Sequence, residues 1–295
     1  MKNFLKLALK VGITAFALYW VFSNTDMVAL SERISRSNPY YLFLAFLAFV
    51  VSQFFASARV HSFFVSAGLK LSPLYNYKLY LLGMFYNMFL PGGIGGDGYK
   101  IFFLNKTFGT EKKKLLTAVF LDKLSGVWAL CVLIILMLLF IPDIGVAYYL
   151  LAILFIGTVI YFFLYKYLFG AYFKLFIPAH IKALGLQFMQ VVSVAFILQA
   201  LGFEGSFFPY LILFLASAFM ALFPFTIGGL GSRELVFLYG AKYFVLDPQL
   251  AVSVSLVFFV VSAVASLPGV YFVFRGGELE ERIKNHPKNN KRYSL

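Results

Sequence analysis

Residues 91–100, with the sequence Pro-Gly-Gly-Ile-Gly-Gly-Asp-Gly-Tyr-Lys, decide the fold of this chain. Their pattern returns far downstream in residues 224–233, with the sequence Pro-Phe-Thr-Ile-Gly-Gly-Leu-Gly-Ser-Arg. The prolines, the isoleucines, a glycine pair, a further glycine and the final basic residue coincide at a constant offset of 133 positions, as between Pro91 and Pro224. Because the two stretches align without a gap, we interpret them as an internal duplication, with repeat motifs at 86–100 and 219–233.

Each repeat interrupts an apolar run and leaves short pieces on both sides. Glycine breaks helices through its backbone freedom, and proline does so through its missing N–H and fixed φ. The four pieces cover residues 77–90, 99–108, 207–223 and 232–246. A break at membrane depth is tolerated only where protein or water satisfies the freed backbone groups. We therefore expect two half-helices meeting at a glycine-rich turn in each repeat, which is a re-entrant hairpin.

The composition is that of an integral membrane protein. Hydrophobic residues make up 62% of the 295 residues and charged residues only 13%, far from the balance of a soluble domain. We expect a single transmembrane domain over 1–295 with no appended catalytic domain. The net charge of +13 is carried largely by loops and by a basic cytoplasmic tail at 276–295, which indicates contact with anionic lipid and not with nucleic acid.

Six runs are long enough to cross a membrane, since a span needs about 20 apolar residues. They cover residues 4–22, 40–66, 115–140, 145–167, 183–203 and 249–274. With the N-terminus in the cytoplasm, the bases at Lys112, Lys174 and Lys182 fall inside and Asp247 falls outside, as the positive-inside rule favours. The prediction is an all-α polytopic protein of the cytoplasmic membrane, with about six spans and both termini cytoplasmic.

Three spans separate the two hairpins, so the hairpins enter from opposite faces and form an inverted repeat. Transporters place their binding site near the bilayer midplane between such broken helices. The alternative is ten complete spans, which also leaves both termini inside but makes four of the spans too short.

Broken helices present backbone N–H groups and a positive dipole end, a setting that suits phosphate. Two bases stand at equivalent places in the repeats, Lys100 and Arg233. The glycines that we expect at this site are Gly92, Gly93, Gly95, Gly96, Gly228, Gly229 and Gly231. The alternative is that these glycines only let helices pack closely.

Charged side chains inside apolar runs are the second signal, because each costs about 2.5–3.5 kcal/mol at a helix centre. The charged candidates are Arg59, Asp97, Asp122, Lys123 and Glu234, and Asn87 is a candidate polar lining residue. We expect Asp97 and Glu234 to pair with Lys100, Arg233, Arg59 or Lys123, or to bind a cationic headgroup. The alternative for Asp122 and Lys123 is an interfacial position from which they reach water.

No constellation for catalysis is apparent. The chain has three histidines and one cysteine, and it contains no Gly-x-Ser-x-Gly, no His-Glu-x-x-His and no nucleotide-binding loop. We therefore expect no enzyme activity, no metal and no cofactor.

The motifs around Asn87, Pro91, Asp97, Asp122-Lys123 and Gly228 to Glu234, together with Arg59, resemble the membrane domain of lysylphosphatidylglycerol synthase/flippase proteins. The resemblance covers nearly the whole chain. It implies a flippase that moves a phospholipid or an aminoacyl-phospholipid between leaflets, here without the synthase domain. Lys123 stands where an arginine is expected, which weakens bidentate phosphate contact at that position. The implied partners are anionic or aminoacylated phospholipids or a polyprenyl-phosphate, and either a second copy of the chain or a separate lipid synthase.

Two other functions stay open at this point. A membrane transferase acting on a polyprenyl-phosphate-linked or phospholipid substrate would form a product without leaflet transfer. A scaffold for a lipid-synthesising partner would need neither inverted hairpins nor Arg59.

Overall fold

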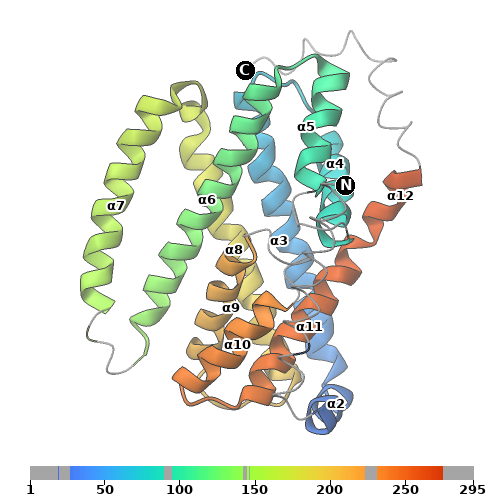
Figure 1. The fold of residues 1–295 in the computed structure, drawn as a ribbon, viewed down its shortest axis with the longest axis vertical. Helices are drawn as coiled ribbons and strands as arrows, with labels where there is room; N and C mark the ends of the chain where they lie inside the picture. Colours follow the sequence, from blue (N-terminus) through green and yellow to red (C-terminus); the bar gives the residue numbers. More distant parts are fainter. Residues whose placement is uncertain are drawn as a thin grey trace.

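The computed structural model of the chain describes residues 27–89, 95–141, 147–222 and 231–274, together with positions 19 and 145. Within these residues every regular element is a helix (Figure 1). The elements are α2 (Met27–Ser35), α3 (Pro39–Ser66), α4 (Pro73–Phe89), α5 (Gly95–Phe108), α6 (Lys112–Leu138), α7 (Ala147–Leu168), η1 (Gly170–Leu175), α8 (Phe176–Ala200), α9 (Phe208–Met220), α10 (Ser232–Tyr243), α11 (Pro248–Ser266) and α12 (Pro268–Phe274). The prediction of an all-α polytopic membrane protein is confirmed.

Five helical stretches in the described part of the chain are long and apolar enough to cross a membrane. They are Pro39–Ser66, Lys112–Leu138, Tyr148–Leu168, Gly170–Ala200 and Pro248–Ser266. Each overlaps one of the six predicted spans, and the remaining span, 4–22, lies outside the described residues. The total of six stays a prediction.

Two predicted span boundaries were wrong. The helix expected at 183–203 begins at Phe176, because the polar side chains near its start are satisfied within the bundle. His180 Nδ1 is hydrogen-bonded to the Phe176 carbonyl at 2.7 Å, and Lys182, which we expected in a loop, donates to Ser62 Oγ at 2.7 Å. The run 249–274 is two helices, because Pro268 cannot donate the backbone hydrogen bond that a continuous helix requires.

The two interrupted segments form the expected hairpins. α4 packs against α5 in one half of the molecule, and α9 packs against α10 in the other half (Figure 1). The hairpins enter from opposite ends, since α4 and α9 end, and α5 and α10 begin, toward the middle of the bundle (Figure 1). At about 1.5 Å per residue these helices of 17, 14, 13 and 12 residues are all shorter than a membrane span. The inverted arrangement is therefore present in the fold.

The position of the first break differs from the prediction. We expected the second arm to begin near residue 99, but α5 begins at Gly95 and contains Gly95, Gly96 and Gly98. A glycine in the first turn of a helix costs little where another backbone must approach closely, and Gly96 meets this condition. In the second hairpin Gly231 precedes α10 with φ of 85°, a conformation that favours glycine.

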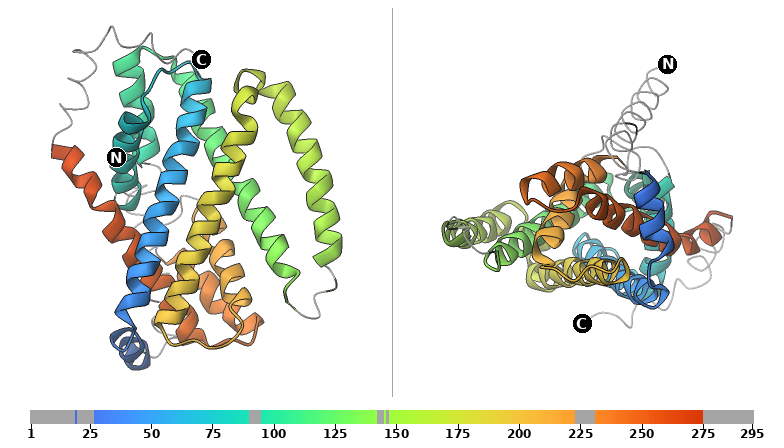
Figure 2. Two further views of the ribbon diagram at one scale, coloured as in Figure 1. Left: turned by 180° about the vertical axis from the view of Figure 1, so that it is seen from behind. Right: turned by 90° about the horizontal axis from the view of Figure 1, so that it is seen from below.

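The described part of the bundle holds two large hydrophobic cores with a polar layer between them, and a small third cluster at Leu238 and Val252. α3 and α8 run side by side through both cores (Figure 2). Along α3 one core ends at Phe49 and the other begins at Val60. Along α6 one core ends at Leu121 and the other begins at Leu130. The intervening segments, 52–59 of α3 and 122–129 of α6, carry buried serines and charges, so the cores leave a polar level inside the bundle.

α7 lies apart from the rest of the bundle and contacts chiefly α6 and η1 (Figure 1). Most of its side chains face outward, including Phe155, Ile156 and Phe163. An apolar helix of this kind is expected to be surrounded by lipid acyl chains.

Candidate functional site

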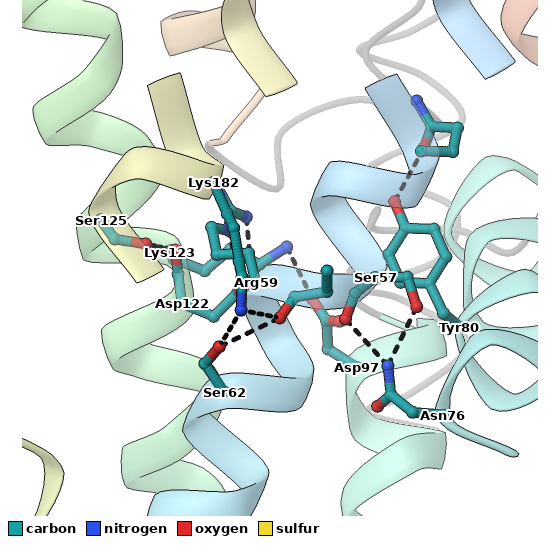
Figure 3. Close-up of polar contacts among 12 residues, drawn as sticks. Ser57, Arg59, Ser62, Asn76, Tyr80, Asp97, Asp122, Lys123, Ser125 and Lys182 are labelled. Atoms are coloured by element: carbon teal, nitrogen blue, oxygen red, sulfur yellow. Dashed lines mark hydrogen bonds and ion pairs between the residues drawn. The ribbon is translucent and has the colours of Figure 1, made fainter. Parts of the chain in front are cut away.

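The centre of the polar layer is a buried ion pair between α3 and α6. Arg59 donates from Nε to Asp122 Oδ1 at 2.8 Å and from Nη2 to Asp122 Oδ2 at 3.1 Å, a two-pronged contact (Figure 3). Both residues are 7% exposed. Gly126 leaves room for the guanidinium, since a Cβ there would lie 3.1 Å from Nη1. The interfacial position that was the alternative for Asp122 is therefore wrong.

Asp97 joins the first hairpin to α6. Its Oδ1 lies 2.7 Å from Lys100 Nζ on the same helix. Its Oδ2 lies 2.8 Å from Lys123 Nζ on α6 (Figure 3). Asp97 and Lys100 are each 5% exposed, whereas the Lys123 side chain is 41% exposed. Lys123 is the twelfth of the 27 residues of α6, about 16 Å from its start. A lysine at that depth is costly without a polar partner, and Asp97 is the partner of Lys123.

One donor of this cluster has no acceptor. Arg59 Nη1 is buried and makes no hydrogen bond, although the other guanidinium nitrogens are satisfied. A buried guanidinium N–H without a partner is costly, so such a group is a candidate contact for a ligand oxygen.

A polar seam beside the cluster was missed by the sequence reasoning. Tyr80 donates to Gln53 Oε1 at 2.8 Å, and the Lys100 ammonium lies 5.6 Å from the centre of the Tyr80 ring. Asn76 donates to the backbone oxygen and the hydroxyl of Ser57, at 2.8 and 2.9 Å (Figure 3). These contacts lock α4 against α3. The sequence did not predict these contacts, because the polar residues that make them occur singly and at irregular spacing.

Asn87 and Gly96 close the first hairpin. Asn87 Oδ1 accepts a hydrogen bond from Gly96 N at 2.8 Å, which satisfies one free N–H at the start of α5. Gly96 lies against the backbone of Gly83 on α4, so closely that a Cβ at Gly96 would overlap the Gly83 carbonyl. Asn87 was predicted to line a cavity, and in the structure its amide oxygen is engaged by the backbone.

In the second hairpin a carboxylate, and not an amide, accepts the free backbone N–H at the start of the second arm. Glu234 is fully buried, and its Oε2 accepts from Gly231 N at 2.6 Å while its Oε1 accepts from the Ser255 hydroxyl at 2.8 Å. Arg233 lies over the ring of Phe258, 5.3 Å from its centre. Among the ion pairs of the described residues none joins Glu234 to Arg233. The expectation that Glu234 pairs with a base is thus wrong.

The predicted residues fall into three groups. Arg59, Asp97, Lys100, Asp122 and Lys123 form one connected cluster. Gly231, Arg233 and Glu234 form a second group at the start of α10. The remaining glycines, Gly92, Gly93, Gly228 and Gly229, lie outside the described residues, and substrate contact by any predicted residue stays a prediction.

Replacing Ser255 with alanine is expected to lower the free energy of unfolding by about 1–3 kcal/mol, because the buried Glu234 carboxylate loses a donor. Ser253→Ala is the matched control, since Ser253 is also buried on α11 but donates only to the Gln249 carbonyl of its own helix. Thermal unfolding in detergent measures both. Equal shifts in the two variants would contradict the role given to Ser255.

Comparison with known protein families supplies the identity. The family described as the lysylphosphatidylglycerol synthase TM region matches residues 7–269, which is most of the chain. Neither the comparison with curated proteins nor that with solved structures gave a match. The resemblance inferred from the two repeats and the intramembrane charges is confirmed by the family match. The chain belongs to the lysylphosphatidylglycerol synthase TM region family and is a multi-pass membrane protein that takes part in lipid handling.

Proposed function

We propose that this protein is a lipid translocase that moves a phospholipid headgroup between the leaflets of the cytoplasmic membrane. The observation that carries the proposal is a buried cluster of charges beside a broken-helix hairpin, with a second hairpin entering from the opposite end. Intramembrane charges are costly and mark substrate pathways. Inverted broken helices are the architecture in which such a pathway opens alternately to the two sides.

The headgroup would be bound by the cations whose hydrogen-bonding groups are not all used by the protein. The Lys123 side chain is partly exposed, Arg59 has one unsatisfied N–H, and Arg233 lies over an aromatic ring. Cations in a polar space shielded from bulk water bind phosphate through charge-assisted hydrogen bonds. The acyl chains would stay in the bilayer while the headgroup crosses.

The proposed orientation follows from the charges at the two ends of the bundle. The end at which α4 and α5 enter carries Lys70, Lys112, Lys113 and Lys114. At the other end Arg33 is paired with Asp247 at 2.8 Å, which partly neutralises it. The excess of bases supports the proposal that the first end faces the cytoplasm. The cytoplasmic position of both termini stays a prediction.

The test is leaflet exchange of fluorescent phospholipids in proteoliposomes. Arg233→Ala is expected to slow exchange about tenfold or more, because a charge-assisted contact contributes about 1.5–3 kcal/mol. Lys242→Ala on the same helix is the control, since Lys242 is exposed near the end of α10. Undiminished exchange in Arg233→Ala would remove Arg233 from the pathway. Formation of a new lipid product without exchange would replace the proposal with a transferase.

A further inference from the structure

The polar layer carries more positive than negative charge. Its cations are Arg59, Lys100, Lys123 and Arg233, and its carboxylates are Asp97, Asp122 and Glu234. Four cations against three carboxylates leave one positive charge. The segments 90–94 and 223–230 between the half-helices contain no charged residue, and neither does the apolar stretch 11–22. The balance of four cations and three carboxylates is counted over the described residues of the layer.

Lys182 lies nearby on α8 and does not alter the conclusion. Its Nζ donates to Ser62 Oγ at 2.7 Å and to the Ala58 carbonyl at 3.3 Å, both on α3. Lys182 adds a further cation with neutral partners, so the balance shifts only toward positive charge.

Every carboxylate of the layer is already engaged. Asp97 is held by two ammonium groups, and Asp122 receives two N–H groups from one guanidinium. Glu234 accepts from a backbone N–H and a serine hydroxyl. Among the described residues of the layer, a ligand ammonium therefore finds no carboxylate that lacks both a cation and a hydrogen-bond donor. Burial of such an ammonium without a carboxylate partner would be costly. A ligand anion, by contrast, finds Lys123 and the unsatisfied Nη1 of Arg59.

We infer that the cargo is an anionic phospholipid with no ammonium group on its headgroup. The inference rests on the proposed function and narrows its substrate class. A headgroup phosphate offsets excess positive charge of the layer, whereas an aminoacylated headgroup adds unpaired cations.

The mechanism of selection is an exchange of partners at Lys123. When the phosphate arrives, Lys123 turns from Asp97 to the phosphate, and Asp97 keeps Lys100 as its counter-ion. Because the Lys123 contact is the ion pair that joins α5 to α6, its release also frees the first hairpin to move relative to α6.

The experiment compares lipids that share acyl chains and carry one fluorescent acyl label but differ in headgroup charge. Wild-type protein in proteoliposomes is given phosphatidylglycerol, lysyl-phosphatidylglycerol, phosphatidylethanolamine or phosphatidic acid. We expect phosphatidylglycerol to exchange at least about tenfold faster than lysyl-phosphatidylglycerol. Equal or faster exchange of the lysylated lipid would overturn the inference.

Lys123→Gln then tests the charge directly. This variant lowers the excess charge while Asp97 retains Lys100, so we expect it to fold and to lose about tenfold of its preference for phosphatidylglycerol over zwitterionic phosphatidylethanolamine. Lys123→Arg should retain the preference, and Lys113→Gln at the exposed start of α6 is the control. An unchanged preference in Lys123→Gln contradicts the inference.

A binding measurement separates failure of the inference from failure of the proposed function. Thermal stabilisation of the detergent-solubilised protein is recorded with each of the four lipids. If no lipid exchanges but phosphatidylglycerol stabilises the wild type and the lysylated lipid does not, the translocase proposal fails and the charge inference stands. Equal stabilisation by the lysylated lipid overturns the inference whether or not exchange occurs.

Discussion

Gly96→Ala is expected to open the first hairpin and to abolish transport. A Cβ at Gly96 would overlap the carbonyl of Gly83, and both groups are backbone, so neither side can give way by a rotamer change. Overpacking of a core side chain costs about 1–3 kcal/mol, and a clash with backbone is expected to reach or exceed the upper end of that range. The readouts are thermal unfolding in detergent and lipid exchange in proteoliposomes.

Gly98→Ala is the matched control for this variant. Gly98 lies on the same helix and is exposed, and a Cβ added there would meet no atom within 4 Å. Alanine is favoured over glycine in a helix by about 1 kcal/mol, so Gly98→Ala should unfold at an equal or higher temperature. If both variants behave alike, close contact between Gly83 and Gly96 does not hold the hairpin.

Asp122→Leu is expected to destabilise the protein by about 3–5 kcal/mol, because it leaves the buried Arg59 guanidinium without its counter-ion. The double variant Arg59→Met/Asp122→Leu should recover most of this loss, since an apolar pair can replace a buried ion pair at little cost. Transport should not recover in the double variant, because the unsatisfied donor of Arg59 is gone. Thermal unfolding and lipid exchange report the two effects separately.

The comparison pair is Arg33 and Asp247, which is partly exposed at the end of the bundle. Arg33→Gln should change stability by no more than about 1 kcal/mol, as is usual for an exposed pair. A double variant at Arg59 and Asp122 that transports normally would show that this ion pair serves stability alone.

The sequence predicted the hairpins because helix-breaking residues are rare in apolar runs, and the two breaks share one spacing. It also predicted the members of the ion cluster, because few charges occur inside these runs. Arg59 and Asp122 are 63 positions apart and Asp97 and Lys123 are 26 apart, so their pairing depends on how α3, α5 and α6 pack. Sequence alone left both a buried and an interfacial position open for Lys123.

Other parts of the site carry no pattern that a single sequence reveals. Gly83 and Ser255 are small residues inside apolar helices. Their roles depend on tertiary contacts, of Gly83 with Gly96 and of Ser255 with Glu234. Glu234 was expected to meet a base because an acid next to Arg233 suggests charge pairing. In the structure the carboxylate instead accepts a hydrogen bond from the backbone N–H of Gly231. The early start of α8 was not predicted, because a lysine at position 182 favoured a loop. In the structure Lys182 lies within the helix and donates to Ser62.

The two hairpins share a backbone plan but differ in where each places its acid. Asp97 of the first hairpin aligns with Leu230, and Glu234 of the second aligns with Ile101. One copy uses its acid to hold two lysines, and the other uses its acid to hold a peptide N–H and a serine. The duplication therefore provides no redundancy, because neither hairpin can replace the other. In a chimera with two first hairpins, the Ser255 hydroxyl would lose its acceptor, the Glu234 carboxylate.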